Sequence, residues 1–345
     1  MTARSLGLFY RTDGDTLERA YKHHLSGFSE WTEKEHADKY LIFPENLGPH
    51  MCLDETSTKD GELFTILSNK DGHCRKGSIA AIVRGTRLSD VTDALMRIPE
   101  ESRKVVADIT MDFASTMASI ASAAFPWADH ILDRFHMQKM AIDGVNNLRM
   151  KHKREAMSIE AEERKELRRK EMERIKHWQK HSPGWCKTHK MVPKNYHAKE
   201  LENGDTLPEL LERSSYLLRM SSEKWTPKQK ERAKLLFELY PDIKEAYGLS
   251  HGLRVIFNNK RATKASAKVS LSEWYEKVAA FKNSDFCSLA KTLESREDEV
   301  LNYFLYRRTN ASAESLNTKI KAFRAQLRGI IDLKFFLFRL TNIYA

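Results

Sequence analysis

The sequence lacks the features of membrane and secreted proteins. It has no run of about 18 uncharged apolar residues, the length that spans a bilayer, and its start, Met1-Thr-Ala-Arg-Ser5, has no apolar stretch like a signal peptide. Its four cysteines, at positions 52, 74, 186 and 287, lie far apart and form no Cys-x-x-Cys pair. These absences argue against a disulfide framework and predict a soluble, intracellular, cytoplasmic protein.

The chain does contain enough apolar residues for a core and an excess of positive charge. Of its 345 residues 41% are hydrophobic, which suits two or three domains, or one domain with a large insertion. The 58 Lys and Arg against 48 Asp and Glu give a formal charge of +10 and a pI near 9.2. This charge favours a polyanionic partner such as nucleic acid, although many basic proteins bind nothing acidic.

Two candidate strands that each end in a carboxylate are the most informative stretch. One is Val105-Val-Ala-Asp-Ile-Thr-Met-Asp112, the other is Ala128-Asp-His-Ile-Leu-Asp133, and the small-residue segment 114–125 between them predicts a helix. In an open α/β sheet ligands bind beyond the carboxyl ends of the strands, so Asp112 and Asp133 lie where chemistry is expected. Taken alone, such acids are more often strand-end caps.

Three apolar runs upstream predict an antiparallel meander. They are residues 51–54, which end in Asp54, then 63–67 and 78–83, with a turn at 69–72. Residues 88–98, stopped by Pro99, predict a helix that crosses over to the next strand. The predicted order is β-β-β-α-β-α-β, with one acid on the first strand and another after the fourth.

Helical segments are predicted on both sides of this sheet. Residues 1–50 predict a small helical lead-in in which Ser26-Gly27 separates two short helices. A packing or dimerisation element is favoured over a helix-turn-helix there, because the second helix has few basic residues. Residues 140–305 predict a large all-helical insertion.

The first part of the insertion, to about residue 180, is densely charged and leaves two interpretations open. Pairs such as Glu160/Arg164 and Glu166/Lys170 at i,i+4 spacing stabilise a helix. Such a run is usually a solvated helix face, and a surface that contacts the DNA backbone is the alternative. The following Cys186-Lys-Thr-His189 resembles half of a zinc site, but a second ligand pair is missing.

Residues 306–345 contain a further acid in a helical pattern. A helix capped by Asn310 or Ser312 would carry Glu314 in its first turn. At 3.6 residues per turn, Glu314 shares a stripe with Asn317 and a row of cations, whereas Leu316, Ile320, Phe323 and Leu327 form an apolar stripe. The pattern predicts a helix that lies on the sheet, with its acid completing a metal site. For Glu314 alone, a partner of the helix dipole is the simpler interpretation.

These segments closely resemble a known family. Asp112, the run Phe125-Pro-x-Ala128, the motif Asp133-Arg-Phe-His136 and the motif Thr309-Asn-Ala-Ser-Ala-Glu314-Ser-x-Asn317-x-Lys-Ile-Lys321 are similar to bacterial insertion-sequence transposases of the DDE superfamily. More specifically, the chain resembles the ISL-type group and its ISAon-like branch. The resemblance covers essentially the whole chain.

The resemblance implies an α/β fold with a ribonuclease-H-like mixed sheet (β-β-β-α-β-α-β-α) and a large all-helical insertion between the last strand and the final catalytic helix. It implies that Asp54, Asp112 and Glu314 are the catalytic triad and hold two Mg²⁺ or Mn²⁺ ions, about 4 Å apart. The remaining implied site residues are Asp133, His136 and Asn317 as active-site support, and Arg134, Lys319, Lys321, Arg324 and Arg328 as DNA-binding residues.

The implied activity is metal-dependent cleavage at the ends of an insertion sequence, followed by transfer of the 3′-OH to target DNA. The implied partners are double-stranded DNA and a second copy of the chain in a synaptic homodimer. Fuller members of the family carry an N-terminal zinc ribbon, which needs Cys-x-x-Cys, so a separate DNA-binding protein from an adjacent reading frame is a further expected partner.

The expected organisation is a helical lead-in at 1–50, the first part of the catalytic core at 51–139, the insertion at 140–305 and the final helices of the core at 306–345. Two alternatives use the same residues differently. One is a ribonuclease-H-like nuclease without strand transfer, and the other is a non-catalytic DNA-binding relative.

Overall fold

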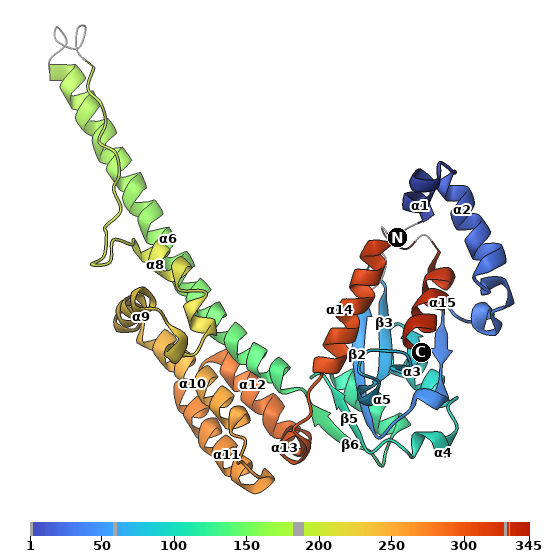
Figure 1. The fold of residues 1–345 in the computed structure, drawn as a ribbon. Helices are drawn as coiled ribbons and strands as arrows, with labels where there is room; N and C mark the ends of the chain where they lie inside the picture. The colour runs from blue at the N-terminus through green and yellow to red at the C-terminus, as the bar shows by residue number, and fades with distance from the viewer. Residues whose placement is uncertain (1–2, 58–60, 182–189, 328–329, 331) are drawn as a thin grey trace. The chain divides into compact units, whose positions relative to one another are not determined.

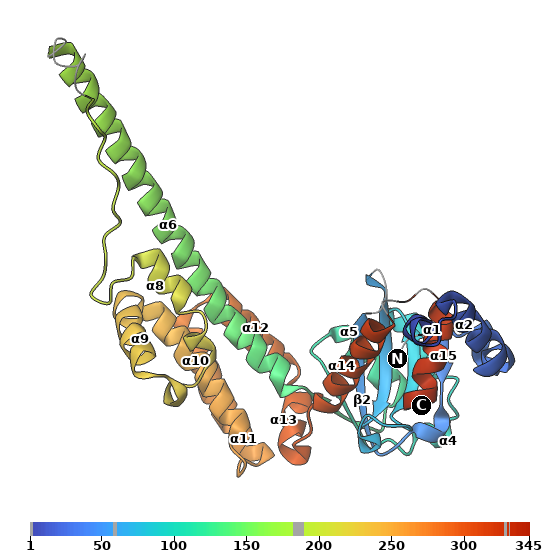
Figure 2. The same cartoon turned by 45° about the horizontal axis from the view of Figure 1, so that its top comes forward.

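The computed structural model describes residues 3–57, 61–181, 190–327, 330 and 332–345, and it consists of two compact units. The first unit comprises residues 1–137, 261–268 and 293–345, and the second comprises residues 138–260 and 269–292. The first unit is mixed α/β, and the described residues of the second unit form only helices and irregular segments (Figures 1 and 2). The predicted α/β class is therefore confirmed.

A six-stranded mixed sheet organises the first unit, with the strand order β1-β4-β3-β2-β5-β6. Strand β2 is antiparallel to β3 and parallel to β5, and β5 is in turn parallel to β6. The first and fourth predicted strands are therefore neighbours, although they lie far apart in the sequence. The strand bounds are β1 (Tyr40–Ile42), β2 (His50–Ser57), β3 (Leu63–Asn69), β4 (Ile79–Arg84), β5 (Asp108–Met111) and β6 (Asp129–Leu132).

The structure corrects three details of the predicted strands. Strand β1 was not expected, because residues 1–50 were predicted to be helical; it pairs with β4 and buries Leu41. Strand β2 continues past Asp54 to Ser57, because the polar residues after Asp54 still pair with β3. Strand β5 begins only at Asp108, and Val105 is 54% exposed, since residues 105–107 precede the sheet.

Helices cover both faces of the sheet. Helix α3 contacts β4 and β1, and α5 contacts β2 and β5, whereas α14 contacts β2 from the other face. The first unit contains α1 (Ala3–Tyr10), α2 (Gly14–Ala20), α3 (Leu88–Leu95), α4 (Glu100–Arg103), α5 (Ser115–Ala124), α13 (Glu297–Tyr306), α14 (Ala311–Gln326) and α15 (Leu333–Tyr344). Its short 3₁₀ and π segments are η1 (Tyr21–Leu25), η2 (Phe28–Glu30), η3 (Thr32–Glu35), η4 (Pro44–Asn46) and η6 (Lys70–Gly72).

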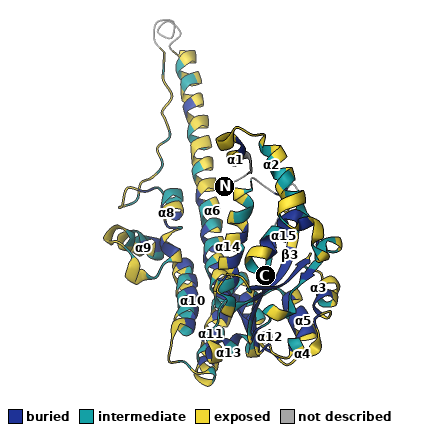
Figure 3. Ribbon diagram, turned by 45° about the vertical axis from the view of Figure 1, so that its right-hand side comes forward, coloured by how far each residue is buried: buried dark blue, intermediate teal, exposed yellow. Residues whose placement is uncertain are grey.

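The core under α14 and α15 lies on only one half of its sheet face. Side chains from β1, β3 and β4, such as Leu41, Phe64 and Ile82, pack with Leu316 and Ile320 of α14. Leu316 and Ile320 of the predicted apolar stripe are thus buried, and Phe323 and Leu327 are partly buried. Figure 3 shows the buried residues in dark blue. Burial of this kind contributes roughly 1.5–3 kcal/mol per large side chain, which holds α14 on the sheet. On β2 and β5 the same face is polar.

The second unit is built around the long helix α6 (Arg134–His181), which begins in the first unit. Arg149 of α6 is buried and donates to the carbonyl oxygen of Leu211 at 2.8 Å, and His152 lies 2.6 Å from Asp242. These contacts fix α6 to the smaller helices. The others are α8 (Leu207–Arg213), η7 (Leu217–Arg219), η8 (Ser222–Lys224), α9 (Pro227–Leu239), α10 (Pro241–Asn258), α11 (Lys264–Phe281) and α12 (Ser284–Ser295).

The helices between β4 and β5 differ from the prediction. Helix α3 ends at Leu95 rather than at residue 98, and the short α4 was not expected. The half zinc site at Cys186 and His189 lies outside the described residues. Among the residues that were searched, no helix is both long and apolar enough to cross a membrane.

Candidate active site

Three of the predicted acids occupy equivalent positions on three neighbouring parallel strands. Leu53 of β2 pairs with Met111 of β5, and Met111 pairs with Leu132 of β6. The residues that directly follow Leu53, Met111 and Leu132 are Asp54, Asp112 and Asp133. Because adjacent strands are about 4.8 Å apart, this register forms a row of acids across the carboxyl ends of β2, β5 and β6.

Helix α14 lies over this row and carries two further predicted residues. The amide Nδ2 of Asn317 donates to Oδ2 of Asp54 at 3.0 Å and to the carbonyl oxygen of Glu55 at 3.1 Å. Glu314 stands one turn earlier on the same stripe, in the first turn of α14, and is exposed. Asn310 occupies the N-cap position, as expected, but its side chain makes no capping hydrogen bond.

Asp54 experiences both burial and neighbouring negative charge. Burial is the largest cause and, together with the charges of Asp112 and Glu314, raises the pKa of its carboxyl to about 6, against the lowering effect of a hydrogen bond from the Glu55 backbone amide. Burial, followed by the charge of Asp112, also raises the pKa of Glu55. The acids therefore disfavour one another's ionised forms, and a cation among them would relieve this cost.

Asp133 and His136 form a supporting pair next to the row. Asp133 is fully buried. Its Oδ1 accepts a hydrogen bond from the backbone amide of Asn310 at 3.3 Å, and its Oδ2 lies 3.1 Å from Nδ1 of His136. The hydrogen bond to Asp133 raises the pKa of His136, an effect that Asp112 and Asp54 reinforce. Asp133 thus links the end of β6 to the start of α14 and orients an imidazole toward the acids.

The donor chemistry fits a hard divalent cation, because carboxylate oxygens are the ligands that Mg²⁺ and Mn²⁺ prefer. The half-buried Asp54 with its raised pKa is the observation that supports this fit. Among the searched residues, however, no group of three or more His, Cys, Asp or Glu side chains stands close enough together to hold a metal ion. Asp54, Asp112 and Glu314 are thus neighbours rather than a preformed ligand sphere.

Sequence reasoning missed a second charged cluster, at the opposite ends of β2 and β5. Asp108 is 1% exposed and lies 2.5 Å from Nδ1 of His50, 3.3 Å from Nε of Arg308 and 3.7 Å from Nζ of Lys70. Arg308 belongs to the segment that leads into α14, so this cluster ties that segment to the sheet. An acid inside an otherwise apolar strand was the available signal, since such a residue must be paired.

The predicted DNA-binding residues lie in different surroundings. Lys321 is exposed on the stripe of Glu314, and Arg324 is half-buried. Lys319 is directed elsewhere and donates to the carbonyl oxygen of Cys74 at 2.9 Å. The guanidinium of Arg134 lies 4.8 Å from the centre of the Phe135 ring. Arg328 lies outside the described residues.

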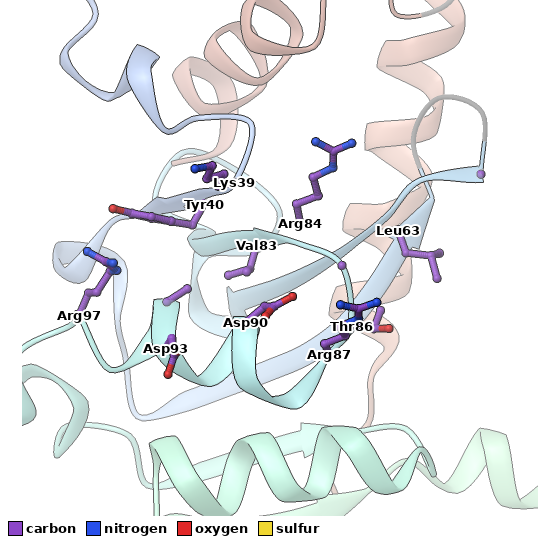
Figure 4. Close-up of a pocket in the computed structure, with 13 residues that line it drawn as sticks. Lys39, Tyr40, Leu63, Val83, Arg84, Thr86, Arg87, Asp90, Asp93 and Arg97 are labelled. Carbon is purple, nitrogen blue, oxygen red and sulfur yellow. The ribbon is translucent and has the colours of Figure 1, made fainter.

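A pocket of about 620 Å³ lies near the β1 edge of the sheet and contains none of the predicted catalytic acids (Figure 4). It is bordered by β4, by the loop that follows it and by α3. Arg84 there pairs with Glu62, and the guanidinium of Arg97 lies 4.7 Å from the centre of the Tyr40 ring. With Asp90 and Asp93 also in its wall, the pocket is of mixed charge and lacks the row of acids.

Comparison with known proteins gives one clear result. A family model described as "Transposase", that of the ISL3 group of DDE transposases, matches residues 51–340. No curated protein and no solved structure matches the chain. The matched region includes the sheet from β2 onward, the helical second unit and α14, and therefore contains every residue of the candidate site. The chain belongs to the ISL3-type family of DDE transposases.

Proposed function

We propose that this protein cleaves DNA at the ends of an insertion sequence and joins the freed 3′-OH to target DNA, using Asp54, Asp112 and Glu314. We further propose that it belongs to the ISAon-like branch, is bacterial and has a ribonuclease-H-like core. The observation that carries the proposal is the register that aligns Asp54 with Asp112 beneath α14, whose Asn317 bonds Asp54.

The three carboxylates would hold Mg²⁺ or Mn²⁺, which when bound lowers the pKa of a water or hydroxyl nucleophile and stabilises the leaving oxygen. The chain's own residues set up the acids. Asn317 orients Asp54, whose carboxyl has a pKa raised to about 6 chiefly by burial, so that a bound cation would favour its ionised form. Asp133 holds His136 beside the row and holds the first turn of α14 through the Asn310 amide.

Substrate DNA would run along the exposed stripe of α14, with Lys321 and Arg324 at its phosphates. The cations follow Glu314 on the same side of the helix, so a strand whose scissile phosphate lies at the acids would continue past them. Arg134, Lys319 and Arg328 are further proposed contacts, and Lys319 would have to release the carbonyl oxygen of Cys74 to reach a phosphate. A homodimer would bring two element ends together, and a separate DNA-binding protein would recognise them.

The proposal is tested by incubating the full chain with duplex DNA that carries the element end, with and without Mg²⁺ or Mn²⁺. Cleavage only in the presence of metal is expected, and a pre-cleaved end with a free 3′-OH should be joined to a second duplex. Cleavage without any joined product would identify a nuclease. Absence of both reactions, also with a candidate protein from the adjacent reading frame, would contradict the proposal.

A further inference from the structure

The distal part of α6, residues 150–181, has one side occupied by its own chain. Residues 190–200, here called the strap, run back alongside this part of the helix (Figures 1 and 2). The Tyr196 hydroxyl donates to Glu163 at 2.8 Å, and the Arg164 guanidinium lies 5.4 Å from the centre of the Tyr196 ring. The backbone amide of Lys194 donates to Glu171 at 3.2 Å. Two acids of the helix are thus used to hold the strap.

The side of α6 that faces away from the strap is basic. At 100° per residue, five exposed cations cluster opposite Glu163 and Glu171, and a sixth, Arg168, lies at the edge of this group. Within the described parts of the chain, none of the six lies within 4 Å of a carboxylate. They are Lys151, Arg154, Lys165, Arg168, Lys176 and Lys180.

Most acids near this face are already paired. Glu166 lies 2.7 Å from Arg169 and 3.4 Å from Lys170, and Glu173 lies 3.0 Å from Arg169. The mixed charge visible in the sequence is therefore segregated in the fold. Glu163 and Glu171 hold the strap, and Glu166 and Glu173 pair with cations of their own helix. Of the described acids, Glu162 lies among the six cations without an ion-pair partner, so an excess of positive charge remains on the face opposite the strap, here called the basic face.

The length and composition of the basic face select a partner. Residues 151–180 extend about 44 Å along the helix axis, more than one turn of B-DNA, about 34–36 Å. An interfacial membrane helix needs an apolar face. Between residues 151 and 180 the large exposed apolar residues are Met157, Ile159 and Met172, and at 100° per residue these three do not share one face. A regular, extended array of phosphates matches such a row of cations best.

We propose that the basic face of α6 contacts the phosphate backbone of duplex DNA without reading its sequence. This surface is distinct from the stripe of α14 and from the acids, so the inference does not depend on DNA cleavage. Because each neutralised phosphate releases condensed counterions, the face would add salt-dependent affinity rather than specificity.

The test is binding of the full chain to a 40-base-pair duplex of arbitrary sequence, in EDTA, by fluorescence anisotropy over a series of NaCl concentrations. The variant Lys165→Gln/Arg168→Gln/Lys176→Gln/Lys180→Gln removes four cations of the basic face. The slope of log K against log[NaCl] should become shallower by up to about 3.6, or 0.9 per phosphate contact. Circular dichroism checks that α6 remains helical.

A matched variant removes the same charge from exposed lysines on α9, α10 and α11 of the same unit: Lys228→Gln/Lys230→Gln/Lys244→Gln/Lys277→Gln. Its slope should equal that of the unmodified protein. An unchanged slope in the α6 variant, or an equal change in both variants, would overturn the proposal. The proposal would also be overturned if the α6 variant lost binding to polyglutamate but kept its binding to DNA. The partner of the basic face would then be an acidic polypeptide.

Discussion

Asn317 is the side chain whose replacement tests the geometry of the site most sharply. Its amide makes one hydrogen bond to a carboxylate, Asp54, and one to a backbone carbonyl, that of Glu55. A bond to a charged group contributes about 1.5–3 kcal/mol and a neutral one about 0.5–1.5 kcal/mol. Because the side chain is only half-buried, the lower ends apply, and Asn317→Ala should cost about 2 kcal/mol.

If this energy positions Asp54 for the reaction, about 2 kcal/mol corresponds to roughly a 30-fold lower cleavage rate. The assay is metal-dependent cleavage of element-end DNA, together with hydrogen exchange of the α14 and β2 amides, which should exchange faster in the variant. Hydrogen exchange is preferable to a global unfolding curve, because a protein of two compact units need not unfold in one step.

The matched control is Thr318→Ala in the same helix. The Thr318 hydroxyl donates only within the helix, to the carbonyl oxygen of Glu314 at 2.9 Å, and the residue is exposed. This variant should cleave at nearly the unmodified rate. Equal cleavage by Asn317→Ala and the unmodified protein, with unchanged exchange at β2, would refute the idea that α14 positions Asp54.

Three further predictions concern DNA binding and stability. Charge reversal by Lys321→Glu and Arg324→Glu should weaken binding of element-end DNA and reduce its salt slope; a retained slope would argue against a DNA path along α14. Asp108→Asn should destabilise the first unit by about 3 kcal/mol, because His50 and Arg308 lose their buried partner; unaltered thermal unfolding would contradict this. In the second unit, burial alone would raise the pKa of Asp205, but hydrogen bonds from Arg213 and Arg232 hold it below its ordinary value. Because the carboxyl of Asp205 has a lower pKa in the folded state than in the unfolded state, its ionisation stabilises the folded protein. This stabilisation should be complete above about pH 4 and should be lost as the pH falls through the folded-state pKa. Asp205→Asn should therefore unfold with a weaker acid dependence, measured by circular dichroism between pH 2 and 6, and identical acid profiles would exclude the linkage.

The strands that carry the acids were predictable because they combine apolar runs with an acid at a fixed place. The runs before Asp112 and Asp133 lie at β5 and β6, and the helix between them lies at α5. The three-residue strand β1 has no such pattern. It forms because its backbone pairs with β4 and Leu41 fills the core under α15, which only the assembled sheet reveals.

The strand ends at which Asp112 and Asp133 lie were predictable, but the supporting contacts of the candidate site were not. The stripe of α14 at 3.6-residue spacing placed Glu314 and Asn317 together, and the fold adds the bond from Asn317 to Asp54. The partners of Asp108, which are His50 and Arg308, could not be predicted, because they belong to β2 and to the segment before α14 and no local pattern links them to β5.

Which cations of α6 remain unpaired could not be predicted from the sequence either. Between residues 160 and 174 the sequence has six Glu and six Lys or Arg, a mixture that is typical of a solvated helix face. Which acids are used up depends on where the strap lies, as the bond between Glu163 and Tyr196 illustrates. Charge segregation of this kind needs the tertiary contacts.

The most direct test of the account is cleavage of element-end DNA by Asp54→Asn, Asp112→Asn and Glu314→Gln, and by their three pairwise combinations, in Mg²⁺ and in Mn²⁺. Residues that act as one unit give non-additive losses, so each single variant should lose cleavage and no double variant should lose more. Each variant should keep the far-ultraviolet circular dichroism of the unmodified chain. Cleavage at the unmodified rate by any one of the three would contradict the claim that these acids form one site.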